Sequence, residues 1–333
     1  MKILAIQFRY LGDAVLVTPA LRALREHFPG GALHVLVAEE VAPLLQHLPW
    51  LTRVWAFPRK RGQASLARSW PVIRALRRER FDRSVDFGGN DRSAIVSLLC
   101  GARQRLGPYW PGGFLGRRFC YTETVRLETQ QHVSRRDCQL LSAWGIAPPA
   151  CPAIEIRADP GLDSAAAQLL PCPAILCHLA TSQPKKEWPI PHWAEFFNRA
   201  RAAGYDVVFS TGIAPREQAL LAELKRLLPG APALPVLSDL PTFLAVLKRA
   251  RLFISGDTGP LHFAAGLGVP TIGLFGPSPA GKWAPLGPSH QALQGGDCGC
   301  GIGSSDCLSA SPCMGRISPE AVLRLVLTAL PPG

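Results

Sequence analysis

The sequence predicts an α/β protein built from two doubly wound parallel sheets. Its 333 residues exceed a typical single domain and favour two. Short apolar runs alternate with amphipathic stretches from the first residue, as in strand–helix–strand units. This alternation restarts after a proline-rich break at residues 147–152. We therefore expect an N-terminal domain, 1–150, a linker, and a C-terminal domain, 161–333, whose last helix is a candidate to pack back on the first domain.

The expected strands of the first domain are short apolar runs, which occur at residues 2–7, 33–38, 53–57 and 83–87. The expected helices are amphipathic, and they cover residues 14–28, 41–47, 66–80, 92–100 and 132–144. Pro29 and Gly30 close the first helix, because proline and glycine interrupt helical structure. The order of strands and helices predicts a parallel sheet covered on both faces.

The second domain repeats this order. Its expected strands are 174–178, 205–210, 252–255 and 269–275. Its expected helices are 193–203, 215–228, 240–249, 260–267 and 319–330. Ligands of open α/β sheets bind at the carboxyl ends of the strands, so we expect the functional residues in the loops that follow the strands, lining a cleft between the two domains.

The composition excludes general disorder, since 47% of the residues are apolar, 18% are charged and the mean hydropathy is +0.13. The longest uncharged stretch, 263–281, holds three prolines and five glycines, which argues against a membrane-spanning helix. We expect no signal peptide, because only a short apolar run separates Lys2 from Arg9 and reads as the first strand. We expect a cytoplasmic protein with reduced thiols.

The net charge of +12 is unevenly distributed. Residues 1–160 hold 23 Lys and Arg against 13 Asp and Glu, whereas residues 161–333 hold 13 against 11. Arginine supplies most of the excess, and its planar guanidinium suits phosphate and carboxylate groups. The first domain is therefore expected to meet an anionic substrate, an acidic membrane surface or nucleic acid, although single arginines more often coat exposed helices. No recognition motif accompanies them, so nucleic acid is the least favoured partner.

Asp13 follows the first strand and the tight turn at Gly12. There its carboxylate could accept a proton from a bound hydroxyl. An aspartate at the start of a helix is also a common cap for free backbone N–H groups, and spacing alone favours the cap.

A loop between an expected strand and helix in the second domain carries Thr181, Ser182 and Lys186. Two hydroxyls and a cation could donate hydrogen bonds to a diphosphate. The alternatives are ordinary turn hydrogen bonds for the hydroxyls and a solvated surface for the lysines.

The clearest local pattern is the segment FISGDTGPLHFAA at residues 253–265. A buried strand ends, a glycine-bearing turn follows, and a helix begins near Pro260. The free amides of Thr258, Gly259 and Leu261 predict a phosphate site at the positive end of this helix. Asp257 would orient the turn or bind a sugar hydroxyl, whereas His262 could simply be a core residue. Elsewhere, Glu217 could bind ribose hydroxyls or be an ordinary first-turn glutamate.

Several motifs are missing. No G-x-G-x-x-G follows a strand, and there is no Walker motif. No paired aspartates of the D-x-D type are present, so we expect chemistry without a metal or other cofactor. Four cysteines cluster near the C-terminus, but their spacing is unlike a standard zinc knuckle, so structural zinc is the less favoured reading for Cys298, Cys300, Cys307 and Cys313.

Three ordered motifs resemble those of glycosyltransferase family nine, the bacterial lipopolysaccharide heptosyltransferases. They are LGDAVLVTPAL at 11–21, KEWP at 186–189 and DTGPLH at 257–262, followed by Pro270 and FGP at 275–277. The resemblance covers nearly the whole chain. It implies the GT-B fold of two Rossmann-like domains and the transfer, with inversion, of L-glycero-D-manno-heptose from ADP-heptose to the inner core of lipopolysaccharide. It also implies a peripheral enzyme at the cytoplasmic face of the inner membrane, acting on a lipid-linked anionic saccharide.

The resemblance further implies residue roles. Asp13 matches the general base, and Lys186 matches a lysine that contacts the donor. The other implied donor-binding residues are Thr181, Ser182, Glu217, Asp257, Thr258, Gly259 and His262. The implied acceptor-binding residues are Arg59, Lys60 and Arg61, which would otherwise form an ordinary solvated loop.

Two alternatives remain open. One is another two-domain enzyme of sugar nucleotides, such as a 2-epimerase or a transferase with a different donor sugar. The other is a two-domain solute-binding protein, which the missing signal peptide disfavours because such proteins are exported.

Overall fold

The protein divides into two compact units, Met1–Ile156 and Arg157–Gly333, which are considered separately. The computed structural model describes residues 1–58, 66–110, 112–114, 116–296, 298, 300, 307 and 309–330. Within these residues, no helix is both long and apolar enough to cross a membrane.

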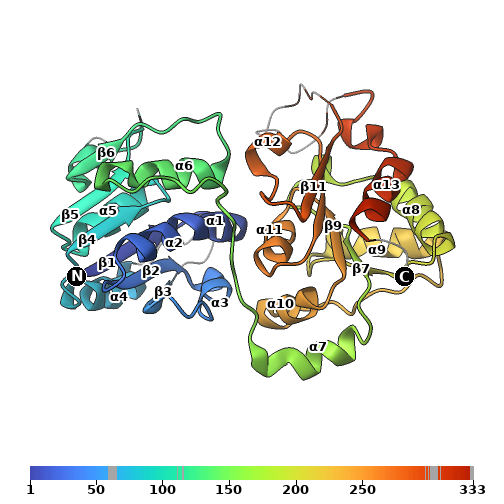
Figure 1. The fold of residues 1–333 in the computed structure, drawn as a ribbon, viewed down its shortest axis with the longest axis horizontal. Coiled ribbons are helices and arrows are strands. Elements are labelled where there is room, and N and C mark those ends of the chain that lie inside the picture. The colour runs from blue at the N-terminus through green and yellow to red at the C-terminus, as the bar shows by residue number, and fades with distance from the viewer. Residues whose placement is uncertain are drawn as a thin grey trace. The chain divides into compact units, whose positions relative to one another are not determined.

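The first unit is a parallel six-stranded sheet in the order β3-β2-β1-β4-β5-β6 (Figure 1). The strands are β1 (Lys2–Gln7), β2 (Ala32–Ala38), β3 (Arg53–Phe57), β4 (Arg83–Asp86), β5 (Gln104–Pro108) and β6 (Glu123–Val125). The sequence predicted four of them, and missed β5 and β6. The strand order is that of a dinucleotide-binding fold, in which the chain reverses its direction of winding between the first and fourth strands.

Helices cover the sheet of the first unit. They are α1 (Leu11–Leu16), α2 (Thr18–His27), α3 (Ala42–Leu45), α4 (Leu66–Arg78), α5 (Asp91–Leu99) and α6 (Val133–Leu140). The expected helix 14–28 is interrupted at Val17, and Pro19 lies in the first turn of the second piece, where its missing N–H is tolerated. Ile73 and Leu76 of α4 pack with Leu4 and Ile6 of β1 in one apolar cluster.

The second unit is a parallel five-stranded sheet in the order β11-β10-β9-β7-β8. Its strands are β7 (Ile175–His178), β8 (Val207–Ser210), β9 (Leu252–Gly256), β10 (Thr271–Phe275) and β11 (His290–Gln294). The sequence predicted all but β11. Here the winding reverses between β7 and β9, as in flavodoxin-like sheets.

The helices of the second unit are α7 (Asp163–Leu169), α8 (Ile190–Ala202), α9 (Pro215–Leu227), α10 (Leu240–Lys248), α11 (Gly259–Gly266), α12 (Ala280–Trp283) and α13 (Pro319–Ala329). The last helix, α13, packs against α8 (Figure 1). A hydrogen bond links the segments before these two helices. The indole N–H of Trp188, just before α8, donates to the carbonyl of Ile317, just before α13, at 2.9 Å.

His178 at the end of β7 makes folding of this unit sensitive to acid. It lies 3.0 Å from the hydroxyl of Ser210, between the rings of Phe243 and Phe253. Burial lowers the pKa of His178 from 6.5 to about 4. The unfolded chain therefore binds a proton below pH 6.5 that the folded chain does not, so stability falls as the pH drops from 6.5 to about 4.

Replacing this histidine should flatten that dependence. We expect His178→Phe to remove up to about 3 kcal/mol of the stability change between pH 6.5 and 4, since one pKa unit corresponds to about 1.4 kcal/mol. Urea unfolding at a series of pH values measures it, with His27→Phe as the control, since His27 is exposed on the first unit. Equal slopes for the wild type and His178→Phe would contradict the prediction.

Candidate functional site

The candidate site of the first unit lies where its winding reverses, between β1 and β4. Ligands of doubly wound sheets bind at this point, outside the carboxyl ends of the strands. The loops that follow the two strands are joined there, because Nε of Arg9 donates to the carbonyl of Gly88 at 2.7 Å. Asp13 lies in the first turn of α1, which begins directly after this loop.

Asp13 is buried, with 7% of its surface exposed. Burial raises the pKa of its carboxyl group above 3.8, and the positive charges of Arg9 and Arg136 oppose that rise. Hydrogen bonds from the backbone amides of Tyr10 and Asp13 itself act in the same direction as the arginines. Tyr10, and not Asp13, is the N-cap of α1, and Asp13 lies in the first turn of this helix. Asp13 therefore supports the start of the helix without being its cap, and this does not conflict with a role as a base.

The sequence analysis missed a buried ion pair that acts on Asp13. Nη2 of Arg136 lies 3.0 Å from Oδ1 of Asp137, and both side chains are almost fully buried in α6. Burial raises the pKa of Asp137 to about 6. A signal was present in the sequence, since Arg136 and Asp137 follow Val133 and precede Leu140 at helical spacing, on the face that packs into the core.

A second carboxylate, Asp86, ends β4. It is fully buried, accepts a hydrogen bond from the hydroxyl of Tyr121 at 2.5 Å, and accepts another from the amide of Gly89 at 3.0 Å. Burial raises the pKa of Asp86. Its two acceptor bonds hold the loop after β4 in place, so we assign Asp86 to the shape of the site and not to proton transfer.

The candidate site of the second unit lies between β7 and β9, again where the winding reverses. Lys186 comes from the loop after β7, and Asp257 follows β9. Their side chains form an ion pair, Nζ to Oδ2, at 2.7 Å, and are only 13% and 10% exposed. The structure therefore brings together two residues that the sequence placed in separate motifs. The alternative that the lysines of this loop form a solvated surface is wrong, because Lys185 is also buried.

Gly256 lets the end of β9 approach the loop that carries Lys186. A Cβ atom on Gly256 would lie 2.7 Å from the carbonyl oxygen of Lys186 and 2.8 Å from Cγ2 of Thr181. Atoms do not approach this closely, so a side chain at position 256 would force the loop to move. Only glycine fits here.

We therefore expect Gly256→Ala to displace Lys186 and to weaken the binding of the diphosphate that the sequence predicts at this loop, for which ADP is the probe. A lost hydrogen bond to a charged group costs about 1.5–3 kcal/mol, which corresponds to about 10- to 100-fold in affinity. Calorimetric titration with ADP measures the affinity, and thermal unfolding reports whether the variant folds. Gly230→Ala is the control, because a Cβ there meets nothing within 4 Å. Wild-type ADP affinity in a folded Gly256→Ala variant would refute the expectation.

Hydrogen bonds within the loop shape the segment that carries Lys186. The hydroxyl of Thr181 donates to the carbonyl of Gln183 at 2.6 Å, the turn hydrogen bond that the sequence left open as an alternative. The amide of Thr181 donates to Glu187, which also pairs with Arg216 of α9. Arg216 in turn donates to the carbonyl of Thr181 at 2.6 Å. By contrast, the Ser182 side chain is exposed.

The N-terminus of α11 lies beside Asp257. Thr258 is its N-cap and makes no capping bond through its side chain. The amide of Leu261 donates to the carbonyl of Thr258 at 3.2 Å, so Thr258 and Gly259 carry the amides better suited to an anion. His262, one turn further, is buried in the helix.

Other expected site residues have different surroundings. Oε2 of Glu217 accepts from the amide of Ala214 at 3.2 Å, so this glutamate caps its own helix, the ordinary role that the sequence left open. Arg59, Lys60 and Arg61 lie outside the described residues. Sγ of Cys300 and Sγ of Cys307 are 3.8 Å apart. Among the residues that the structure describes, no group of three or more His, Cys, Asp or Glu side chains could hold a metal ion.

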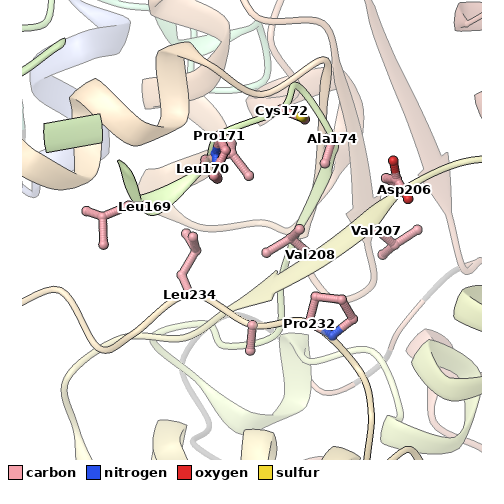
Figure 2. Close-up of a pocket in the computed structure, with 11 residues that line it drawn as sticks. Leu169, Leu170, Pro171, Cys172, Ala174, Asp206, Val207, Val208, Pro232 and Leu234 are labelled. Carbon is pink, nitrogen blue, oxygen red and sulfur yellow. The ribbon is translucent and has the colours of Figure 1, made fainter. Parts of the chain in front are cut away.

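An apolar hollow occurs at the opposite edge of the second sheet (Figure 2). Its lining includes Ala174, Val207 and Leu234, near the amino ends of β7 and β8. Asp206 is the charged residue in the lining, and it pairs with Arg201. Because it lacks convergent polar groups, this hollow is not the candidate site.

Solved structures share this architecture. A glycosyltransferase of family 9 from Veillonella parvula aligns with a TM-score of 0.81 at 20% identity, over 98% of this chain and 96% of that one. E. coli ADP-heptose lps heptosyltransferase II aligns with a TM-score of 0.77 at 22% identity, over 99% and 98%. The fold is therefore GT-B, two Rossmann-like α/β units, as the resemblance implied.

A family model described as glycosyltransferase family 9 (heptosyltransferase) matches residues 69–305, and this match defines the class of the protein as a glycosyltransferase. Lipopolysaccharide heptosyltransferase 1 of Pseudomonas aeruginosa is 30% identical over 315 residues, which are 90% of this chain and 85% of that protein. The chain belongs to glycosyltransferase family 9, and it is an enzyme.

Proposed function

We propose that this enzyme transfers L-glycero-D-manno-heptose from ADP-heptose to the inner core of lipopolysaccharide, with inversion at the anomeric carbon. Membership of family 9 supports the class of reaction, and the names of its relatives support the donor and acceptor. The observation that carries the proposal is the ion pair of Lys186 with Asp257, beside the N-terminus of α11 at a winding reversal, where an anionic leaving group is best accommodated.

Asp13 is the proposed general base. Its carboxylate accepts the proton of the acceptor hydroxyl while that oxygen bonds to the anomeric carbon of heptose. The bond from that carbon to the diphosphate breaks on the opposite face, and its electron pair leaves with ADP. A single displacement inverts the centre. Burial supports this role, because a carboxyl group with a raised pKa is a stronger base than an exposed one.

The second unit is the proposed donor-binding domain. Lys186 would stabilise the charge that develops on the diphosphate, and the amides of Thr258 and Gly259 would donate to a phosphate oxygen. Asp257 would hold the Lys186 ammonium in position until the donor arrives. Ser182, whose side chain is exposed, would donate to the diphosphate, whereas Thr181 would act by shaping the loop. Because Lys186 supplies the positive charge, the proposed reaction uses no metal.

The first unit is the proposed acceptor-binding domain, and the acceptor is proposed to be lipid-linked. The arginines of this unit outside α4 suit the carboxylates and phosphates of an anionic saccharide. We further propose that the enzyme works at the cytoplasmic face of the inner membrane, bound to it peripherally.

Incubation of the purified enzyme with ADP-heptose and a panel of truncated core acceptors tests the donor and acceptor together. We expect one acceptor to gain the mass of a heptose, measured by mass spectrometry, with an equal amount of ADP released. If product forms only from another sugar nucleotide, that nucleotide is the donor in place of ADP-heptose. Free epimerised sugar without acceptor would identify an epimerase instead.

A further inference from the structure

One exposed surface of the first unit plays no part in the proposed chemistry. Trp70, Arg74, Arg77 and Arg78 recur at positions i, i+4, i+7 and i+8 of α4, so they share one side of the helix. Arg74, Arg77 and Arg78 line a hollow together with Arg80. We call these five residues the arginine face.

The opposite side of α4 is buried, which keeps the arginine face at the surface. Ile73 and Leu76 pack into the apolar cluster beneath the helix, so the arginines cannot turn inward. Nη1 of Arg77 lies 3.4 Å from the carbonyl of Leu99, where α5 ends. Two further apolar side chains are exposed on α5, namely Ile95 and Leu98.

The charge of the arginine face has no acidic counterpart nearby in the sequence. Residues 59–78 contain seven Lys and Arg and no Asp or Glu. The next acidic residue, Glu79, is engaged elsewhere, with Nζ of Lys2 at 2.7 Å and Nη1 of Arg53 at 3.6 Å. An aromatic side chain that is 54% exposed stands one turn before the arginines, at Trp70.

We propose that the arginine face docks on an anionic phospholipid bilayer. Arginines bind the lipid phosphates, and the indole of Trp70 inserts at the level of the headgroups, where tryptophan is favoured. This inference rests on the proposed lipid-linked acceptor, to which it adds the surface that meets the membrane. The face does not bind the saccharide itself.

The topology fixes which end of the arginine face lies nearer the carboxyl edge of the first sheet. A helix that follows a parallel strand begins at the carboxyl edge of the sheet, and α4 is the helix after β3. The Trp70 end of the face is therefore the end nearer the edge at which Asp13 lies. A bilayer on this face would lie alongside the acceptor-binding unit.

Sedimentation with vesicles tests the proposal without any sugar substrate. The triple variant Arg74→Glu, Arg77→Glu, Arg78→Glu is compared with wild type on vesicles of phosphatidylglycerol and phosphatidylethanolamine. Each arginine near an anionic surface strengthens binding about fivefold, so we expect the triple variant to bind at least about 100-fold more weakly. Trp70→Ala should weaken binding several-fold, and wild type should not sediment with phosphatidylcholine vesicles.

The matched control is Lys225→Glu, Arg226→Glu, Arg324→Glu. It reverses three exposed charges of the second unit and alters the net charge equally. It should bind vesicles within about threefold of wild type, and circular dichroism should show both variants folded. An equal loss in both triple variants, or wild-type binding by the arginine-face variant, would overturn the proposal.

Turnover of a water-soluble acceptor separates this proposal from the proposed function. We expect the arginine-face variant to keep the wild-type KM and kcat for such an acceptor. A raised KM would assign the face to the saccharide and overturn membrane docking. If no heptose is transferred by wild type, the proposed function fails, while the vesicle result still decides the nature of the face.

Discussion

Replacing Asp13 by Asn should reduce heptose transfer by about 10³-fold while leaving ADP binding intact. General base catalysis contributes about 10²–10⁴-fold, and the amide of asparagine cannot accept the proton. Asparagine retains the size of the side chain and one acceptor oxygen for the amide of Tyr10 that caps α1. Initial rates with saturating donor and acceptor measure the effect, and calorimetric titration measures ADP affinity.

The control for this substitution is Asp86→Asn, at the other carboxylate of the same edge. It leaves one acceptor oxygen for two donors, Tyr121 and Gly89, and should lower stability by about 1–3 kcal/mol, with a far smaller effect on the rate of the folded protein. Turnover by Asp13→Asn close to that of wild type would remove Asp13 from the mechanism.

The pH profile gives an independent test of Asp13. Because burial raises the pKa of Asp13 in the free enzyme, the acid limb of kcat/KM should lie above 3.8, the ordinary pKa of an aspartate. The positive charge of Arg136 opposes this rise. Removing that charge in Arg136→Met should therefore move the acid limb to higher pH, whereas an unmoved limb would assign it to another group.

Replacing Lys186 by Ala should reduce kcat by about 10²–10³-fold, as does the loss of one electrostatic contact to a developing charge. It should also leave the carboxylate of Asp257 without its partner beside the proposed diphosphate. The donor would then meet a negative charge where the wild type offers a balanced pair, so its affinity should fall as well.

A double substitution separates the effect of the unpaired Asp257 carboxylate from the loss of the Lys186 charge itself. Lys186→Ala with Asp257→Asn removes both charges, and we expect it to bind ADP more tightly than Lys186→Ala alone, with no recovery of kcat. Equal ADP affinities for the single and double variants would show that Asp257 acts independently of Lys186. The control is Lys248→Ala, which breaks an exposed ion pair with Asp163 of α7 and should affect neither quantity.

Much of the fold was predictable because the buried strands are strongly apolar. The bounds of β1 and β3 agree with the sequence prediction. The strands that were missed lie at or next to the edges of the sheets, where fewer side chains are buried. Thus β11 is half-exposed, and β5 carries Gly107 and Pro108, which are unfavourable in strands.

The sequence singled out the residues of the candidate site, but it could not show which of their side chains form pairs. Asp13, Lys186 and Asp257 stood out because each follows a strand. Nothing in the spacing could indicate that Lys186 reaches Asp257, because the two are 71 residues apart and meet only through the strand order. Likewise, the hydroxyl of Thr181 and the carboxylate of Glu217 bond to nearby backbone groups. The sequence alone does not decide whether such a side chain bonds to the backbone or to a ligand.

The ion pair at 2.7 Å also bears on which anions the second unit retains. Any phosphate that approaches Lys186 must compete with a carboxylate already seated on it. A lone orthophosphate gains little from that exchange, because it replaces one partner with another. A ligand that simultaneously engages the amides of Thr258 and Gly259 gains more than it displaces. If these residues bind the donor as proposed, the resting pair would favour pyrophosphate esters, which can reach all three groups, over simple anions.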